Sequence, residues 1–252
     1  MTGSEPLCEK RKQSLTDAVY VAIKERIICL HMPPGSHCTE GHLAQELGSS
    51  KTPVREALAR LEREGFVQVS SRLGYSVAPV TLRDVRNLFE LRILLEGEAA
   101  ALAASRISDA AQLRLLEEAA TIGYDHDDQS SIARFLCSNT QFHVTIAKAG
   151  GNDRMVRVLE EVLDQMTRLF HLSLALTSRA DQLVHEHQDL VKAVVSGDAN
   201  RARELAVGQI RASQTMVIDA LLSSEALLSA NVAVTPYTRT PLTVVGQAET
   251  GS

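Results

Sequence analysis

Residues 39–65 read TEGHLAQELGSSKTPVREALARLEREG, a pattern typical of two short helices joined by a tight turn. Thr39 is suited to cap the first helix, and Gly48 follows where a left-handed residue would end it. Ser50 or Thr52 can cap the second helix, whose apolar residues repeat at helical spacing. Two helices joined in this way form a helix-turn-helix, whose second helix enters the major groove of DNA by its N-terminal end.

The first turn of that second helix collects groups that bind nucleic acid. Ser50, Lys51, Thr52 and Arg55 bring hydroxyls, cations and unpaired backbone N–H groups together, which suits contacts to phosphates and base edges. We expect Arg55 to form the bidentate pair to guanine. This stretch alone also fits an ordinary helical hairpin with a solvated basic end.

The next segment favours the DNA-binding interpretation. Residues 66–70 and 75–80 are alternating runs on either side of a glycine-containing tip, which predicts a β-hairpin. A hairpin directly after a recognition helix is the wing of a winged helix. Arg72 and Gly74 lie at its tip, where a long cation and a glycine suit contacts to phosphate or the minor groove.

Charge is distributed unevenly along the 252 residues. Residues 1–80 hold ten Lys and Arg against nine Asp and Glu, a net of +1, whereas residues 81–252 hold sixteen against twenty-two, a net of −6. Affinity for DNA must therefore come from a local basic cluster, doubled by dimerisation, rather than from bulk charge. Trp is absent and aromatic residues are scarce, so duplex DNA is a better partner than single strands.

The four cysteines lack metal-ligand spacing, and the sequence has neither a signal peptide nor a run of about eighteen apolar residues. We therefore expect a reduced, cytoplasmic protein with no membrane segment.

The helical periodicity predicts a mainly α protein of two domains. We expect a winged helix-turn-helix domain at 14–80, with its helix-turn-helix at about 39–65, and an all-α antiparallel helical bundle at 81–228. Residues 1–13 and 229–252 have the composition of disordered tails.

Bundles place ligand and metal sites among polar side chains that project inward from facing helices. Asn139 and His143 are spaced i, i+4 on one helical face, and His187 and Gln209 lie on two later helices. Three predicted helices thus each contribute polar candidates.

A family resemblance extends over about residues 14–222. Residues 52–67, TPVREALARLEREGFV, resemble the recognition-helix signature of the GntR family of bacterial transcription regulators. Residues 88–96, LFELRILLE, resemble the start of the effector domain of its FadR-like branch, the FCD type. The resemblance implies a homodimer whose helical domain binds a small effector and dimerises.

In the FCD branch, an Asp and three His at these bundle positions typically bind a zinc-like divalent metal. His143 and His187 match, but Asn139 stands at the Asp position and Gln209 at the third His position. Neutral amide oxygens are weak ligands of transition metals. Three alternatives remain: a metal held by His143, His187 and Asn139; a metal-free polar effector pocket lined by all four residues; and a purely structural role.

Arg92 is the remaining candidate. The resemblance implies that it faces the carboxylate of the ligand, which makes a small organic acid the expected effector, because a guanidinium fork matches a carboxylate. The plain alternative is an exposed ion pair with Glu96 at i+4, worth a few tenths of a kcal/mol.

We therefore expect a ligand-responsive transcription regulator, by family default a repressor, that binds an inverted-repeat operator as a homodimer. One alternative is a constitutive DNA-binding regulator whose bundle only dimerises. Another is a metal-dependent helical enzyme, for which the sequence lacks a complete ligand set and any recognisable catalytic motif. We expect no enzymatic activity and no catalytic residue.

Overall fold

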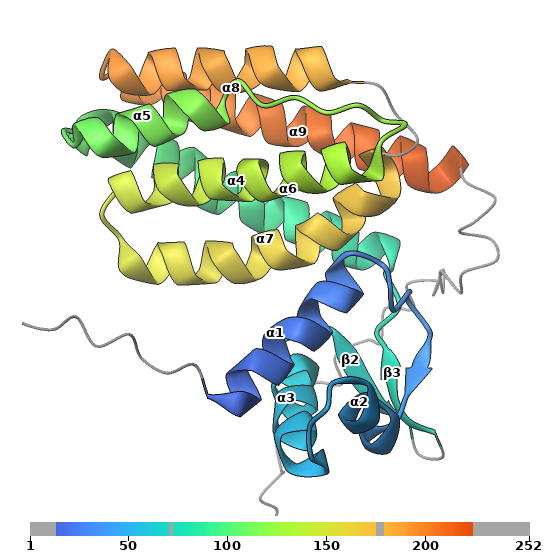
Figure 1. Cartoon of the computed structure of the whole chain (residues 1–252). Coiled ribbons are helices and arrows are strands. Elements are labelled where there is room, and N and C mark those ends of the chain that lie inside the picture. Colours follow the sequence, from blue (N-terminus) through green and yellow to red (C-terminus); the bar gives the residue numbers. More distant parts are fainter. Residues whose placement is uncertain (1–13, 71–72, 175–178, 224–252) are drawn as a thin grey trace, which may run out of the picture.

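The computed structural model describes residues 14–70, 73–174 and 179–223, which form two domains in contact (Figure 1). The N-terminal domain consists of three helices and a small sheet, and the C-terminal domain is a helical bundle. The two predicted tails and Arg72 lie outside the described residues. Within the described chain, no helix has the length and apolarity needed to cross a bilayer.

Helix α1 (Leu15–Ile28) supports the helix-turn-helix from behind. The hydroxyl of Ser14 caps it by accepting from the backbone N–H of Asp17 at 3.1 Å. Its buried face, with Ile23 and Ile27 fully covered, packs on α3.

Helices α2 (Glu40–Glu46) and α3 (Lys51–Arg63) form the predicted helix-turn-helix. Thr39 caps α2 through a hydrogen bond from the N–H of His42. The turn between the helices passes through Gly48, whose φ is +58°, in the left-handed region that favours glycine.

The wing is a three-stranded antiparallel sheet in the order β1-β3-β2. Strands β2 (Val67–Ser70) and β3 (Gly74–Val77) form the predicted hairpin. The sequence prediction missed β1 (His37–Cys38), whose two residues pair with Ser76 and Tyr75 of β3.

Six helices of the described chain build the C-terminal bundle. They are α4 (Leu82–Arg106), α5 (Ala110–Ala119), α6 (Gln129–Ala149), α7 (Asp153–Leu174), α8 (Ala180–Val195) and α9 (Ala199–Ser223). A reciprocal capping box between Thr81 and Asp84 begins α4. Helices α4 and α9 pack closely, because small residues such as Ala99, Ala100 and Ala103 face the core. A cavity with a partly polar lining lies between α4, α6, α7, α8 and α9.

Candidate DNA interface and effector cavity

The recognition helix α3 buries one face and exposes the other. Val54, Leu58 and Leu61 are fully covered, while Lys51 and Arg55 are exposed at the opposite side. The N-cap residue Ser50 makes no capping hydrogen bond with its side chain, so its hydroxyl remains available beside the first-turn N–H groups. Thr52 is exposed on the same turn. The four predicted DNA-contacting residues of α3 thus lie together on one exposed surface.

Arg55 is held in place by a residue that the sequence analysis did not single out. Its Nε donates to Oε1 of Glu40 at 2.9 Å, and its Nη2 donates to Oε2 at 2.7 Å. The hydrogen bonds from Arg55 hold the pKa of the Glu40 carboxyl below its usual range. Glu40 is the first residue of α2, so the pair connects the two helices and fixes the direction of the Arg55 side chain.

Gly74 also has a structural role inside the DNA-binding domain. Its φ is +86°, and a Cβ at this position would lie 2.9 Å from the carbonyl oxygen of Cys38. The close approach of β1 to β3 therefore explains this glycine within the domain itself. Its exposed position still leaves room for a neighbouring phosphate. The predicted contact by Arg72 lies outside the described residues.

The bundle encloses a small polar cavity. Four of the five predicted effector residues line it, namely Arg92, Asn139, His143 and Gln209, together with Ser213 and an apolar wall that includes Phe135, Phe170, Leu174, Leu183 and Met216. Its volume of about 10 Å³ accommodates at most one water molecule. The structure therefore shows the cavity in a closed state, and a larger ligand requires side chains of its wall to move.

A buried ion pair controls the electrostatics of this cavity. Arg92 is only 2% exposed, and it donates to both carboxylate oxygens of Glu96, at 2.5 and 3.3 Å. The Nδ1 atom of His143 lies 2.6 Å from the same carboxylate. Burial alone would raise the pKa of the Glu96 carboxyl, but Arg92 and His143 outweigh it and lower this pKa to about 2. The Arg92–Glu96 pair expected as the plain alternative is thus formed, but it is buried rather than exposed.

His187 lies next to this cluster without any hydrogen-bond partner for either ring nitrogen. Its ring lies 4.2 Å from that of Phe142 and 5.6 Å from that of His143, centroid to centroid. Burial, reinforced by the positive charges of the neighbouring cluster, lowers the pKa of His187 to about 3, so the ring is neutral near pH 7. Nη1 of Arg92 and Oε1 of Gln209 also lack partners. Such buried unpaired groups need a partner to offset their desolvation.

The donor set fits a transition metal poorly. His143 keeps Nε2 free while its Nδ1 faces Glu96, so the potential donors are the imidazoles of His143 and His187 and two neutral amide oxygens, which are weak ligands of transition metals. In the part of the chain that the structure describes, three potential His, Cys, Asp or Glu ligands converge only at the exposed residues 125–127, none of which lines the cavity. The guanidinium of Arg92 would also repel a divalent cation placed beside it.

Helix α7 contacts both this cavity and the DNA-binding domain. Its residues Phe170 and Leu174 belong to the cavity wall. Closer to its N-terminus, Asp164 accepts from the ammonium of Lys24 on α1 at 2.6 Å, and Nε2 of Gln165 donates to the carbonyl oxygen of Glu64 at 2.7 Å. One rigid element therefore contacts both functional regions.

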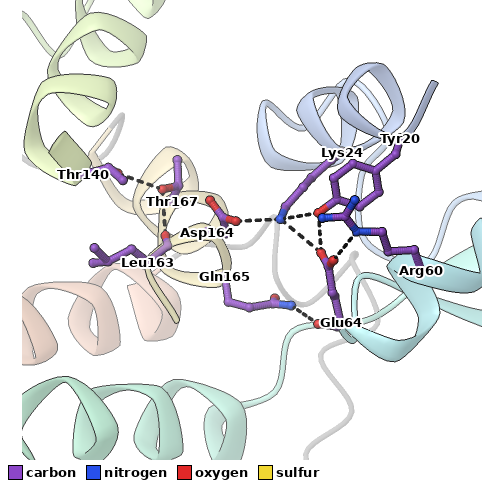
Figure 2. A network of polar contacts seen from close by, with 9 residues as sticks. All are labelled: Tyr20, Lys24, Arg60, Glu64, Thr140, Leu163, Asp164, Gln165 and Thr167. Carbon is purple, nitrogen blue, oxygen red and sulfur yellow. Dashed lines mark hydrogen bonds and ion pairs between the residues drawn. The ribbon is translucent and has the colours of Figure 1, made fainter. Parts of the chain in front are cut away.

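A second set of contacts strengthens the junction from the DNA-binding side. Lys24 also donates to the carboxylate of Glu64 at 3.1 Å, and this carboxylate accepts from the hydroxyl of Tyr20 and from Nε of Arg60 (Figure 2). Burial alone would lower the pKa of the Lys24 ammonium, but hydrogen bonds to Asp164 and Tyr20 outweigh it and raise this pKa above its usual range. The ammonium is therefore permanently charged at the junction.

The N-terminal domain is a winged helix with an exposed recognition helix, and it is joined to a helical domain with a polar cavity. This combination defines a DNA-binding regulator with an effector domain. Residues 15–77 match the model described as bacterial regulatory proteins, gntR family, and residues 87–212 match the FCD domain. The chain belongs to the GntR family, and it is a DNA-binding transcription regulator with an FCD domain. The fold and family predicted from residues 52–67 and 88–96 are confirmed.

Individual relatives agree with this assignment. The uncharacterized HTH-type transcriptional regulator YdhC of Bacillus subtilis (strain 168) is 27% identical over 189 residues, which cover 73% of this chain and 83% of that protein. The probable D-xylose utilization operon transcriptional repressor of Paenarthrobacter nicotinovorans is 28% identical over 173 residues, covering 68% and 74%. The structure of E. coli McbR/YncC has the same fold, with a TM-score of 0.66 and 23% identity, covering 82% of this chain and 98% of that chain.

Proposed function

We propose that the protein is a homodimeric repressor that binds an inverted-repeat operator and responds to a small organic acid. The observation that carries this proposal is the position of α7, which contacts both the polar cavity and the DNA-binding domain. An effector that enlarges the cavity moves side chains of its wall, two of which, Phe170 and Leu174, belong to α7, the helix that also binds Lys24 and the carbonyl oxygen of Glu64. Opening the cavity thereby changes the placement of the recognition helix.

Homodimerisation is supported by an exposed apolar face on α4. Leu91 and Leu94 are 42% and 69% exposed and lie one helical turn apart on α4, a helix whose other face is buried in the bundle. A twofold dimer would place two α3 helices in successive major grooves, which requires half-sites about one helical turn apart.

The chemistry of the cavity supports a carboxylic acid as effector, held without a metal. Nη1 of Arg92 offers an unused charged donor, and Oε1 of Gln209 offers an unused acceptor. A carboxylate satisfies the first, and a hydroxyl or amino group on the same ligand satisfies the second. His187 does not line the cavity in this structure, but its neutral ring lies beside it and has one unpaired donor and one unpaired acceptor.

DNA recognition by α3 is tested first. Operators are selected from random duplexes, and binding is compared for the wild type, Arg55→Ala and Arg63→Ala, a control that removes an exposed arginine from the other end of α3. We expect an inverted repeat, a loss of about 1–3 kcal/mol for Arg55→Ala and a much smaller effect for Arg63→Ala. Equal binding by all three proteins excludes Arg55 from base recognition.

Effector binding is tested with the same operator. Small hydroxy and amino acids are screened for thermal stabilisation of the wild type and for release of DNA, and hits are repeated with Gln209→Leu. A hit that releases DNA and is lost in the variant supports the cavity as effector site. The closed cavity favours one specific alternative, a constitutive regulator whose bundle only dimerises, and absence of any responsive acid would support that alternative.

A further inference from the structure

A second cavity lies between the two domains, outside the bundle. It has a volume of about 480 Å³, within the range of small-molecule sites, and such sites often form at domain interfaces. Gln68 lines it from the wing, Asp84 and Asn87 from α4, and Gln165 and Arg168 from α7. We call this cavity the interdomain cleft.

The cleft contains a buried guanidinium without a countercharge. Arg168 is 5% exposed, and in the described chain no carboxylate lies within ion-pair distance of it. Its Nη1 donates to the carbonyl oxygen of Ala78 at 3.1 Å, its Nη2 makes a long contact of 3.4 Å to Oε1 of Gln165, and its Nε has no partner. Burial lowers the pKa of Arg168 to about 10, and the more distant Asp84 offsets this only in part. The side chain is therefore a cation at pH 7 with one edge nearly unused.

Two other arginines of this protein show what that edge binds. Arg55 and Arg92 each present Nε and Nη2 to the two oxygens of a carboxylate, from Glu40 and Glu96 respectively. This side-on fork is the geometry in which a guanidinium binds a planar carboxylate most strongly. In Arg168, Nη2 makes only the 3.4 Å contact to the amide oxygen of Gln165, and Nε has no hydrogen-bond partner.

We propose that the interdomain cleft binds a small monocarboxylate, whose oxygens occupy Nε and Nη2 of Arg168 in place of Gln165. Asp84 in the cleft wall disfavours a second negative charge, so the site selects a monoanion over phosphate or a dicarboxylate. The amides of Gln68 and Asn87 provide donors and acceptors for the rest of the ligand. This site is separate from the bundle cavity.

Occupation of the cleft also alters the contact between the domains. Gln165 uses its Oε1 for Arg168 and its Nε2 for the carbonyl oxygen of Glu64. A ligand that replaces Oε1 frees the amide to turn, which weakens the hydrogen bond to Glu64 (Figure 2). The ligand thus acts on the junction directly, without passing through the bundle.

The test measures binding of acetate, lactate, pyruvate and benzoate to the full-length protein by calorimetry, with succinate and inorganic phosphate for comparison. The variants are Arg168→Gln and Asn87→Asp, the second of which adds a negative charge to an exposed position of the cleft wall without disturbing the core. Arg157→Gln removes an exposed arginine from the same helix as a matched control, and Gln209→Leu changes only the bundle cavity.

We expect at least one monocarboxylate to bind more tightly than succinate and phosphate. Its affinity should fall by about tenfold or more in Arg168→Gln and Asn87→Asp, and should be unchanged in Arg157→Gln and Gln209→Leu. If Arg168→Gln fails to fold, Asn87→Asp decides the result. The proposal is overturned if no monocarboxylate binds, if Asn87→Asp binds as the wild type does, or if Gln209→Leu alone abolishes binding, which would assign the ligand to the bundle.

Discussion

Replacing Glu96 by Gln should destabilise the bundle strongly and in a pH-dependent way. The carboxylate is 4% exposed and lies between the guanidinium of Arg92 and the ring of His143. Gln has nearly the same shape, so it keeps the packing and removes only the charge. The buried Arg92 then has no countercharge, which is the condition under which breaking a buried pair costs about 3–5 kcal/mol.

The pKa of Glu96 gives an independent magnitude with the same sign. This pKa falls from its usual 4.5 to about 2 in the folded protein. At about 1.4 kcal/mol per pH unit, the ionised carboxylate contributes on the order of 3 kcal/mol to the free energy of unfolding. Because the folded pKa is depressed, this contribution is complete above pH 4.5 and is lost as the pH falls from 4.5 towards 2.

The assay is urea denaturation followed by circular dichroism at several pH values between 7 and 4. The wild type is compared with Glu96→Gln and with Glu90→Gln, which removes an exposed carboxylate from the same helix. We expect Glu96→Gln to lose about 3–5 kcal/mol at pH 7 and Glu90→Gln less than about 1 kcal/mol. The difference between Glu96→Gln and the wild type should begin to shrink below pH 4.5.

His187 adds a second pH dependence to the free energy of unfolding, and the comparison of the wild type with Glu96→Gln separates it from that of Glu96. Its folded pKa of about 3 lies below its usual 6.5, so stability falls as the pH drops below 6.5, by up to about 1.4 kcal/mol per pH unit. Both the wild type and Glu96→Gln keep this slope. If Glu96→Gln were as stable as Glu90→Gln at pH 7, the buried Arg92–Glu96 pair would not contribute to the free energy of unfolding, and the role assigned to its charges in the cavity would be wrong.

Three further predictions concern the DNA-binding domain and its junction. Glu40→Gln should reduce the free-energy difference between specific and non-specific DNA binding by about 1–3 kcal/mol, measured by titration with operator and random duplexes. Specific binding weakens because Arg55 loses the carboxylate that orients it, whereas non-specific binding does not, because a negative charge near the phosphates is removed. Gly74→Ala should destabilise the wing by about 1–3 kcal/mol in thermal unfolding, since φ is +86° and the Cβ has no space; an unchanged melting temperature would contradict this. A double-mutant cycle of Lys24→Met and Asp164→Asn should give a coupling of about 0.5–3 kcal/mol in urea denaturation, whereas additive effects would mean that the ion pair does not join the domains.

The sequence predicted the fold well where the signals are local. The cap at Thr39 lies where this residue was expected to begin a helix, because a side chain that satisfies the first N–H groups needs no distant partner. Strand β1 was missed because two residues carry no alternation. It exists only because β3, nearly forty residues later, offers a free edge.

The candidate site was predicted only in part, since its chemistry depends on burial and on long-range pairing. Glu96 was visible at i+4 from Arg92, but the pattern does not reveal that both side chains are covered. The third member, His143, lies 47 positions beyond Glu96. The volume of the cavity likewise depends on how apolar side chains from several helices meet, which no single helix encodes.

Three arginines illustrate this limit most clearly. Arg55, Arg92 and Arg168 all lie in amphipathic helices with acidic residues nearby in the sequence, so spacing alone gives them similar roles. In the fold, Arg55 is an exposed side chain fixed by Glu40, and Arg92 is a buried one neutralised by Glu96, whereas Arg168 is buried with an amide in place of an acid. The free-energy cost of burying a guanidinium is thus offset by the carboxylate of Glu96 at Arg92, whereas at Arg168 it is offset only by weaker contacts to neutral oxygens. An external carboxylate stabilises the protein more at Arg168 than at Arg92, because only at Arg168 does it supply the first countercharge.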